Sequence, residues 1–215
     1  MAKSEGSPGW FARVVCGVLA ACAAASAAAG VATWHRYELL VELPPEHKPS
    51  GTEALLMADM WFGNLMGWRT AIIIVSGLLF VLWLYTMRDV ADGLWPEGQR
   101  RSRAWLIFGW IVPVANLFVP KMFINDLWAA GRPPHRRERG HWLLTLWWLS
   151  VLAATGTFGK KPGWGREADR AGEAADAMWR VLIGNGVSIV TALLTIAVVW
   201  RLSGMLERAV RGVAI

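Results

Sequence analysis

The stretch WIVPVANLFVPKMFINDLW, residues 110–128, decides the fold, because it has the composition of a transmembrane helix and the interruptions of a loop. Pro113 and Pro120 stand seven residues apart, with Asn116 between them. A proline inside a helix removes one backbone hydrogen bond and clashes with the preceding turn. The segment can cross a bilayer, enter it and return, or pack inside a soluble core. The rest of the sequence distinguishes among these three possibilities.

Four long stretches of the chain carry no charged side chain. They are residues 14–33, 70–87, 142–159 and 181–200, each 18 to 20 residues long. A bilayer core about 30 Å thick requires roughly 20 apolar helical residues. Helices of a soluble bundle normally keep a polar stripe toward water, which these stretches lack. The sequence therefore predicts an all-α integral membrane protein, with transmembrane helices near residues 12–34, 69–88, 142–159 and 181–201.

The tryptophans favour the same interpretation. The chain has 15 Trp and only 2 Tyr, and indole rings prefer the headgroup level of a bilayer, where an apolar body meets one polar N–H. Five of them stand at the ends of the predicted spans: Trp10, Trp34, Trp68, Trp142 and Trp200. We interpret these residues as interfacial anchors.

The N-terminus allows two interpretations. Lys3 and Arg13 followed by an Ala-rich run also fit a secretory signal peptide, and LAAC at residues 19–22 resembles a lipoprotein cleavage site that would leave Cys22 lipidated. The apolar run, however, continues eleven residues beyond Cys22. This length favours a retained first span, and cleavage or lipidation at Cys22 stays open.

The distribution of Lys and Arg predicts the topology, because these residues accumulate on the cytoplasmic side. If residues 104–128 do not cross, the two sides carry 14 and 8 basic residues, whereas a fifth span would give 11 and 11. We therefore expect one membrane domain over residues 1–215 in the plasma membrane, with four spans and both termini cytoplasmic. The external loops would be residues 35–68 and 160–180. Residues 104–128 would form a proline-broken re-entrant or interfacial hairpin.

Several short motifs resemble those of a known family. They are Trp83-x-Tyr85-x-x-Arg88, Trp110-x-x-Pro113-x-x-Asn116-Leu117-x-x-Pro120, Asp126-Leu127-Trp128 and the pair Trp147-Trp148. Over nearly its whole length the chain resembles the actinobacterial membrane protein family called domain of unknown function 4328. The resemblance implies a small multi-span membrane protein without an established activity, and no catalytic residues to carry over. The family's second span ends on more basic residues, whereas Asp89 and Asp92 stand here.

Four polar residues are candidates for a cluster at membrane depth: Asn116, Asn125, Asp126 and Asn185. Polar groups in a bilayer are costly, so they mark functional sites by default. The functional interpretation is a small cavity for a headgroup, an ion or a small substrate. The structural interpretation, which we favour for Asn116, is that its amide caps the carbonyls freed by Pro113 and Pro120. Asp126 is expected at the interface, where water solvates it.

Basic residues beside the hairpin could contact anionic lipids, each contributing about 1 kcal/mol near the surface. The candidates are Arg100, Arg101, Arg103, Arg136 and Arg137. The alternative is that these charges only set the orientation of the chain. Nucleic acid is a poor partner, because the apolar centre of this region belongs in the bilayer.

The sequence contains no catalytic motif, no cofactor-binding motif and no metal-ligand spacing. We therefore expect a non-catalytic membrane protein that acts through lipid or protein contacts, with membrane lipids, a second copy of the chain or another membrane protein as partners. The alternative is a small transporter or channel that uses a polar cavity around Asn116.

Overall fold

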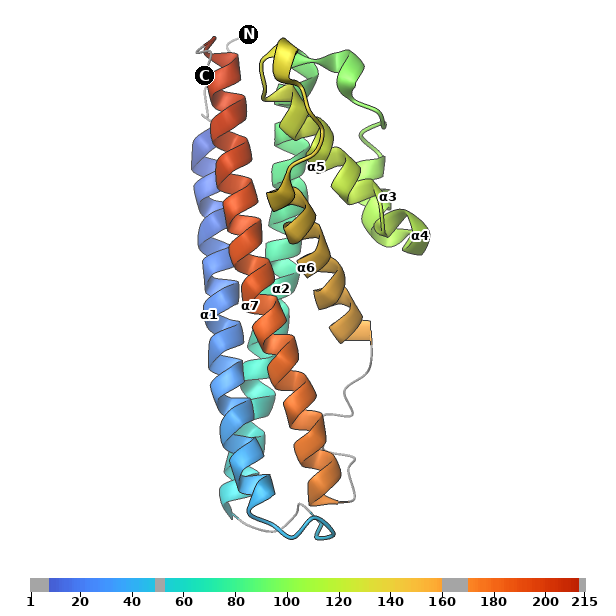
Figure 1. Ribbon diagram of the computed structural model, residues 1–215. Coiled ribbons are helices and arrows are strands. Elements are labelled where there is room, and N and C mark those ends of the chain that lie inside the picture. The colour runs from blue at the N-terminus through green and yellow to red at the C-terminus, as the bar shows by residue number, and fades with distance from the viewer. Residues whose placement is uncertain (1–7, 49–52, 160–169, 213–215) are drawn as a thin grey trace. The chain divides into compact units, whose positions relative to one another are not determined.

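In the computed structural model, residues 8–48, 53–159 and 170–212 are described, and all regular structure within them is helical (Figure 1). The four longer helices are α1 (Pro8–Val41), α2 (Glu53–Leu94), α6 (Trp142–Gly159) and α7 (Ala171–Val210). Between α2 and α6 lie the short helices η1 (Pro96–Gly98), α3 (Trp105–Ile111), α4 (Pro113–Asn116), α5 (Val119–Ala130) and η2 (Pro134–Arg136). The prediction of an all-helical chain is thereby confirmed for the described residues.

Three of these helices, α1, α2 and α7, are long and apolar enough to cross a membrane. Helix α6, which coincides with the third predicted span, has 18 residues and is not among the three. Helices α3 to α5 occupy the predicted hairpin and bend by 110° at their break. The structure thus shows membrane-length helices in the described chain, while the count of four spans remains a prediction.

The long helices extend beyond the predicted spans. Most of the predicted external loop 35–68 is helical, because residues 35–41 continue α1 and residues 53–68 form the first part of α2. Residues 53–68 are rich in Ala, Leu and Met, which are strong helix formers, and contain no proline. In the loop 160–180, residues 160–169 lie outside the described residues, and residues 171–180 open α7.

The chain forms two compact units, and α1, α2, α6 and α7 contribute residues to both. Unit 1 comprises Met1–Leu19, Val75–Leu149 and Leu194–Ile215, and unit 2 comprises Ala20–Ile74 and Ser150–Leu193. The largest fully buried side chains of unit 1 include Trp83, Trp128, Trp147, Phe123 and Leu127. The core of unit 2 is formed by Ala29, Leu40, Leu55, Phe62, Met66, Ala174, Ala177 and Met178.

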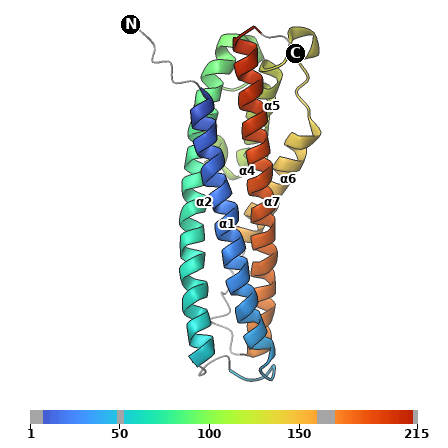
Figure 2. The same ribbon diagram turned by 90° about the vertical axis from the view of Figure 1, so that its left-hand side faces the viewer.

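Contacts within each unit give the relative direction of α1 and α7. In unit 2, the segment after α1 contacts the start of α7, where the backbone N–H of Ala171 donates to the carbonyl of His47 at 2.8 Å. In unit 1, the start of α1 lies beside the end of α7 (Figure 2), and a Cβ on Gly9 would be 2.8 Å from Oε1 of Glu207. Within each unit, α1 and α7 are therefore antiparallel.

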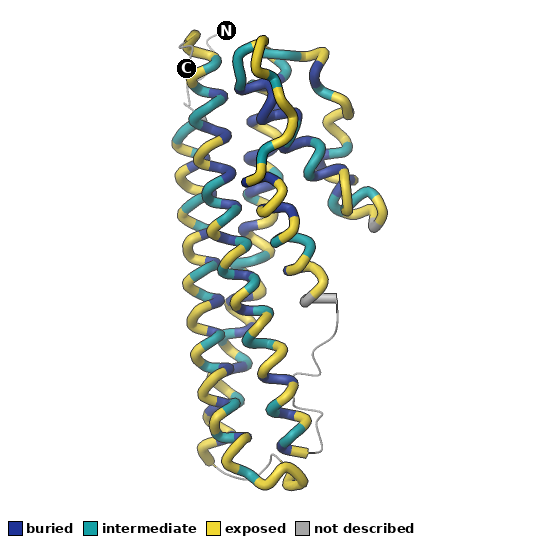
Figure 3. Tube along the Cα trace, in the orientation of Figure 1, coloured by how far each residue is buried: buried dark blue, intermediate teal, exposed yellow. Residues whose placement is uncertain are grey.

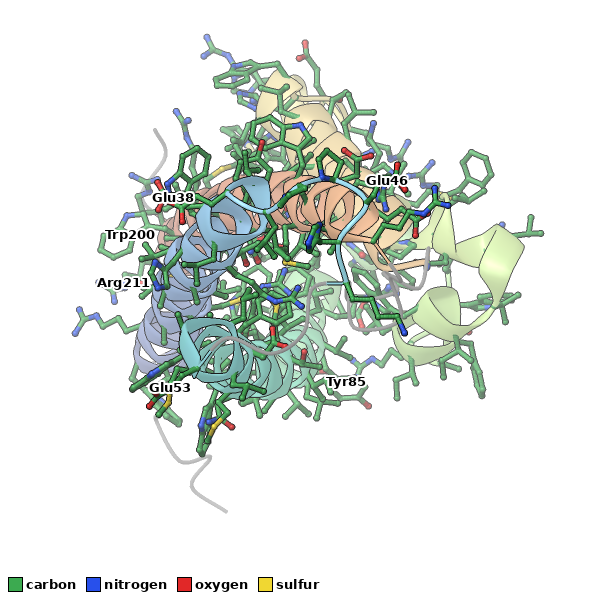
Figure 4. All side chains as sticks on the ribbon, turned by 90° about the horizontal axis from the view of Figure 1, so that it is seen from below. Glu38, Glu46, Glu53, Tyr85, Trp200 and Arg211 are labelled. Carbon is green, nitrogen blue, oxygen red and sulfur yellow. The ribbon has the colours of Figure 1, made fainter. Side chains whose placement is uncertain are left out.

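The surface of the helices is strongly apolar. All five tryptophans expected at the span ends are 46–71% exposed, whereas Trp83, Trp128 and Trp147 are buried. Figure 4 shows Trp200 and Tyr85 at the periphery, and Figure 3 shows exposed residues along every long helix. Large exposed apolar areas on helices of this length are typical of surfaces that face lipid.

Candidate functional site

The segment between α2 and α6 belongs to unit 1 and contains the short helices α3, α4 and α5, bent by 110° at their break; we keep the name hairpin for residues 104–128. Helix α3 ends at Ile111, and Val112 takes an extended backbone (φ −77°, ψ 117°), as expected for a residue before proline. Pro113 then begins α4, and Pro120 stands in the first turn of α5, where its missing N–H costs no helical hydrogen bond. Pro113 therefore starts a helix after the break at which residues 105–111 and 114–130 bend by 110°, and Pro120 is accommodated at the start of α5.

The limbs of the hairpin meet at one glycine. A Cβ on Gly109 of α3 would lie 2.7 Å from Cγ1 of Val119, the first residue of α5. Such a contact is too short for any side chain, so glycine is required for the limbs to approach. Figure 3 shows that α5 carries much of the burial, whereas the α3–α4 end of the hairpin is mostly exposed.

An aromatic cluster holds the hairpin to α6. The rings of Trp110 and Trp148 are 6.2 Å apart, and those of Trp147 and Trp148 are 5.5 Å apart. Phe80 of α2 packs on Trp110 at 6.2 Å and on Trp147 at 5.9 Å. Aromatic pairs at such distances contribute about 0.5–1.5 kcal/mol each beyond their buried area. Trp110, Trp147 and Trp148 of the sequence motifs are thus brought together in one aromatic cluster.

Two indole N–H groups of this cluster are satisfied by specific acceptors. Nε1 of Trp148 donates to the backbone carbonyl of Leu117 at 3.1 Å, at the break between α4 and α5. Nε1 of Trp147 donates to Oγ1 of Thr195 on α7 at 3.1 Å. Trp148 therefore meets a carbonyl that the broken helix leaves without its usual partner.

The two ends of the hairpin region converge on one buried carboxylate. Asp126 of α5 is 1% exposed. It accepts from Nε of Arg100 at 2.9 Å and from the backbone N–H of Arg100 at 3.4 Å, and Nε of Arg139 lies 3.4 Å from its Oδ1. Arg100 precedes the hairpin and Arg139 follows it. Both ends of the segment are thus held at the same place in unit 1.

A second ion-pair network ties the end of α2 to the segment before α3. Nη2 of Arg103 pairs with Asp92 at 2.8 Å, and Nη1 of Arg103 pairs with Asp89 at 2.5 Å. Nε of Arg88 also donates to Asp92 at 2.8 Å. The hydrogen bond to Asp92 is the main reason that the pKa of Arg103 lies above its usual value. Asp89 and Asp92 therefore serve as partners for local arginines.

His141 immediately precedes α6 and packs against α5. Its ring stacks on Trp128 with centroids 4.6 Å apart, and its Nδ1 accepts the backbone N–H of Leu143 at 3.2 Å. Burial, followed by the nearby charges of Arg201 and Arg132, lowers the pKa of His141. The neutral imidazole is therefore the form that fits this site.

Residues 49–204 match the protein family described as Domain of unknown function (DUF4328). The chain belongs to this family. The match includes the whole hairpin and the tryptophan pair of α6. No curated protein and no solved structure matches the chain.

The polar residues predicted for a membrane cluster do not all share one location in this DUF4328 chain. Asn116, Asn125 and Asp126 belong to unit 1, whereas Asn185 belongs to unit 2. The amide of Asn116 is half-buried and makes no hydrogen bond to another described residue; only its backbone N–H bonds, to the carbonyl of Val112 at 2.8 Å. Oδ1 of Asn125 and both amide atoms of Asn185 are buried without a partner among the described residues.

The five predicted lipid-contact arginines have different surroundings. Arg100 and Arg103 are engaged in the ion pairs described above, and Arg101 stacks on Trp105 at 5.9 Å. Arg136 is exposed. Arg137 stacks on Trp95, with Cζ 4.6 Å from the ring centroid.

Arg137 also lines a cavity that sequence reasoning missed. The cavity has a volume of about 240 Å³ and lies in unit 1, between the ends of α2, α5 and α7 and the segment around η2. Its lining comprises Leu94, Ala130, Gly131, Arg132, Pro133, Pro134, Arg137, Met205, Arg208, Ala209 and Gly212. The run RPPHRRER predicts a basic surface, but the contribution of Arg208 depends on the placement of α7, about seventy residues away in sequence.

Unit 2 contains a buried polar layer that the sequence also did not reveal. Arg36 pairs with Asp59 and donates to Sδ of Met178 at 3.1 Å. Arg69 donates to Oγ of Ser188 at 2.6 Å and to Oγ of Ser26 at 3.3 Å. Both arginines are less than 10% exposed. These contacts join α1, α2 and α7 within the unit, and no group of metal-ligating side chains occurs in the described part of the chain.

Proposed function

We propose that this chain is a non-catalytic plasma-membrane protein that acts through lipid contacts, with four transmembrane helices and both termini in the cytoplasm. Helices α1, α2, α6 and α7 cross the bilayer in this proposal, and α3 to α5 enter it from the cytoplasmic side and return. A second copy of the chain, or another membrane protein, is a further partner in keeping with the apolar outer surface.

The observation that carries the proposal is the closure of the hairpin on Asp126. Because Arg100 and Arg139 both bind this carboxylate, the chain before the hairpin and the chain after it lie on the same side of any membrane that the hairpin enters. A crossing segment would place these two arginines about 30 Å apart, the thickness of the hydrocarbon core. The geometry therefore supports a return over a fifth span.

The surface of the hairpin supports insertion. Its α3–α4 end carries apolar side chains that are between 41% and 72% exposed, namely Ile107, Phe108, Ile111, Val112, Val114, Leu117 and Phe118. A contiguous apolar surface of this kind is unfavourable in water and marks a contact with lipid or protein. Backbone groups freed by a broken helix need partners at membrane depth, and Trp148 supplies one for the carbonyl of Leu117.

The charges of the two units support the orientation. Among the described residues, unit 1 contains thirteen Lys and Arg and unit 2 contains five. Basic residues accumulate on the cytoplasmic side of membrane proteins. The chain ends, the hairpin and its flanks belong to unit 1, so this unit faces the cytoplasm in the proposal.

Cysteine labelling in intact cells tests the topology. Cys16 and Cys22 are first replaced by Ala, and single cysteines are then placed at the exposed positions Ser102, Arg136 and Lys48. An impermeant thiol reagent should label Lys48→Cys at once, and Ser102→Cys and Arg136→Cys only after the cells are opened. Labelling of Arg136→Cys from outside, with Ser102→Cys protected, would show that the hairpin region crosses.

A cysteine at the exposed Val114 tests insertion separately. In opened cells, Val114→Cys should react much more slowly than Ser102→Cys with a water-soluble reagent, because hydrocarbon excludes the reagent and keeps the thiol protonated. Equal reactivity in folded protein would show that the end of the hairpin lies in water.

A further inference from the structure

The cavity at the ends of α2, α5 and α7 has the composition of an anion site. Its lining includes Arg132, Arg137 and Arg208 and no acidic residue. We propose that it binds a phosphate group, and specifically the phosphate of an anionic phospholipid. The choice of a lipid rests on the proposed membrane topology, whereas the choice of phosphate rests on the cavity alone.

Arg137 is the fixed member of the site. Its guanidinium stacks on Trp95, and its Nε is buried without a hydrogen-bond partner. A buried charged donor is costly to leave unsatisfied. Gly98 packs against the same ring, since a Cβ at this position would be 2.1 Å from Trp95. The stack thus orients a donor that lacks an acceptor among the described residues.

The other two arginines leave donors available. Arg132 stacks on Trp128 at 5.7 Å, and among the described acidic residues it contacts only Glu138, at 3.7 Å, where Glu138 is 80% exposed. Arg208 uses Nε on the carbonyl of Gly204 at 3.0 Å. A guanidinium has five N–H donors in a planar fork that matches phosphate oxygens. The remaining donors of these side chains can therefore bind a phosphate.

The remaining walls favour a lipid over a free anion. They are apolar and include Leu94, Pro133, Met205 and Ala209. The volume of about 240 Å³ far exceeds the roughly 10–15 Å³ that one water requires by the same measure, so the cavity has room for a phosphate group. The cavity also lies at the ends of two membrane-length helices, α2 and α7, where lipid phosphates are found.

Thermal unfolding of the full chain in zwitterionic detergent tests this site, because a ligand of the folded state raises the melting temperature. The probes are phosphatidylglycerol, phosphatidylcholine and inorganic phosphate, added separately. Phosphatidylglycerol should raise the melting temperature of the wild type, and phosphatidylcholine should not. If inorganic phosphate stabilises as well as phosphatidylglycerol, the assignment to a lipid is overturned. If no anion stabilises, the site itself is overturned.

A matched pair of variants locates the effect. Arg137→Gln with Arg208→Gln removes two charges from the cavity, and Arg13→Gln with Arg180→Gln removes two exposed charges outside it. The first should weaken phosphatidylglycerol binding roughly a hundredfold, about tenfold for each charge-assisted hydrogen bond lost. The second should leave binding within about twofold of the wild type. If both double variants lose phosphatidylglycerol binding equally, the lipid is attracted by net charge alone and the proposed site is wrong.

A measurement on the wild type alone tests the site even if the arginine variants do not fold. Native mass spectrometry from micelles containing equal amounts of both lipids should retain one phosphatidylglycerol per chain in preference to phosphatidylcholine. Equal retention contradicts the proposal. The cysteine-labelling experiment is independent of lipid identity, so its failure would change the topology and leave the anion site standing.

Discussion

The indole nitrogen of Trp148 lies 3.1 Å from the backbone carbonyl oxygen of Leu117, thirty-one residues earlier in the chain. This contact joins α6 to the break between α4 and α5. A broken helix is tolerated in an apolar environment only when its freed backbone groups find partners. The second residue of the tryptophan pair therefore has a specific structural role, as the donor to a backbone carbonyl at the interruption between α4 and α5.

Trp148→Phe tests this role, because it keeps an aromatic ring and removes the N–H. Loss of the hydrogen bond should cost about 1–3 kcal/mol of stability, since the Leu117 carbonyl would be left unpaired. Thermal unfolding in detergent measures the change. Trp142→Phe, at a 65% exposed position, and Asn116→Leu should have much smaller effects. A larger loss for Asn116→Leu than for Trp148→Phe would restore the asparagine as the capping group.

Asp126→Asn should loosen both ends of the hairpin. The carboxylate is 2% exposed and serves two arginines that are 39% and 44% exposed, so water can partly compensate the arginines after the change. We expect a loss of about 1–3 kcal/mol, and faster hydrogen exchange in residues 100–104 and 137–140. Glu138→Gln is the control, because this acid is 80% exposed and should cost less than about 0.5 kcal/mol. Unchanged exchange at both ends would contradict the closure of the hairpin on Asp126.

Gly109→Ala should destabilise the hairpin through a steric clash. The added Cβ would meet Cγ1 of Val119 at 2.7 Å, and valine has little rotamer freedom with which to move away. Overpacking of this kind costs about 1–3 kcal/mol. The double variant Gly109→Ala with Val119→Ala should recover part of the loss in the same unfolding assay. Failure of the second substitution to help would place the glycine requirement elsewhere.

Stability should fall in mild acid through His141. Its pKa in the folded chain is lowered, chiefly by burial and then by Arg201 and Arg132, whereas in the unfolded chain it is expected near 6.5. The unfolded state therefore binds more protons as pH falls through about 6.5, and the free energy of unfolding decreases below that pH. His141→Gln should flatten this dependence in unfolding curves between pH 5 and about 8. An unchanged pH dependence in His141→Gln would exclude His141 as the cause.

The features that the sequence predicted correctly depend on residues that are close together in the chain. The charge-free stretches indicate apolar helices, and α1, α2 and α7 have membrane length. The break at Pro113 follows from proline geometry, which depends only on adjacent residues. The family could also be recognised from its tryptophan and proline spacing, and the match to residues 49–204 confirms it.

Contacts between residues distant in sequence could not be predicted in this way. Asp126 was expected at a solvated interface and is instead buried, because Arg100 and Arg139 approach it from both ends of the hairpin. Asn116 was expected to cap the broken helix, and a tryptophan from α6 meets the Leu117 carbonyl instead. Neither position carries a local pattern that distinguishes these outcomes.

The lengths of α2 and α7 have a consequence outside the bilayer. Their 42 and 40 residues extend about 63 and about 60 Å at 1.5 Å per residue, roughly twice the thickness of a hydrocarbon core of about 30 Å. In the proposed topology, residues 53–68 of α2 therefore stand outside the hydrocarbon, where Leu55 and Phe62 share a buried core with Leu40 and Ala174. The chain would thus carry a helical stalk that projects from the outer face of the membrane by roughly 24 Å at 1.5 Å per residue.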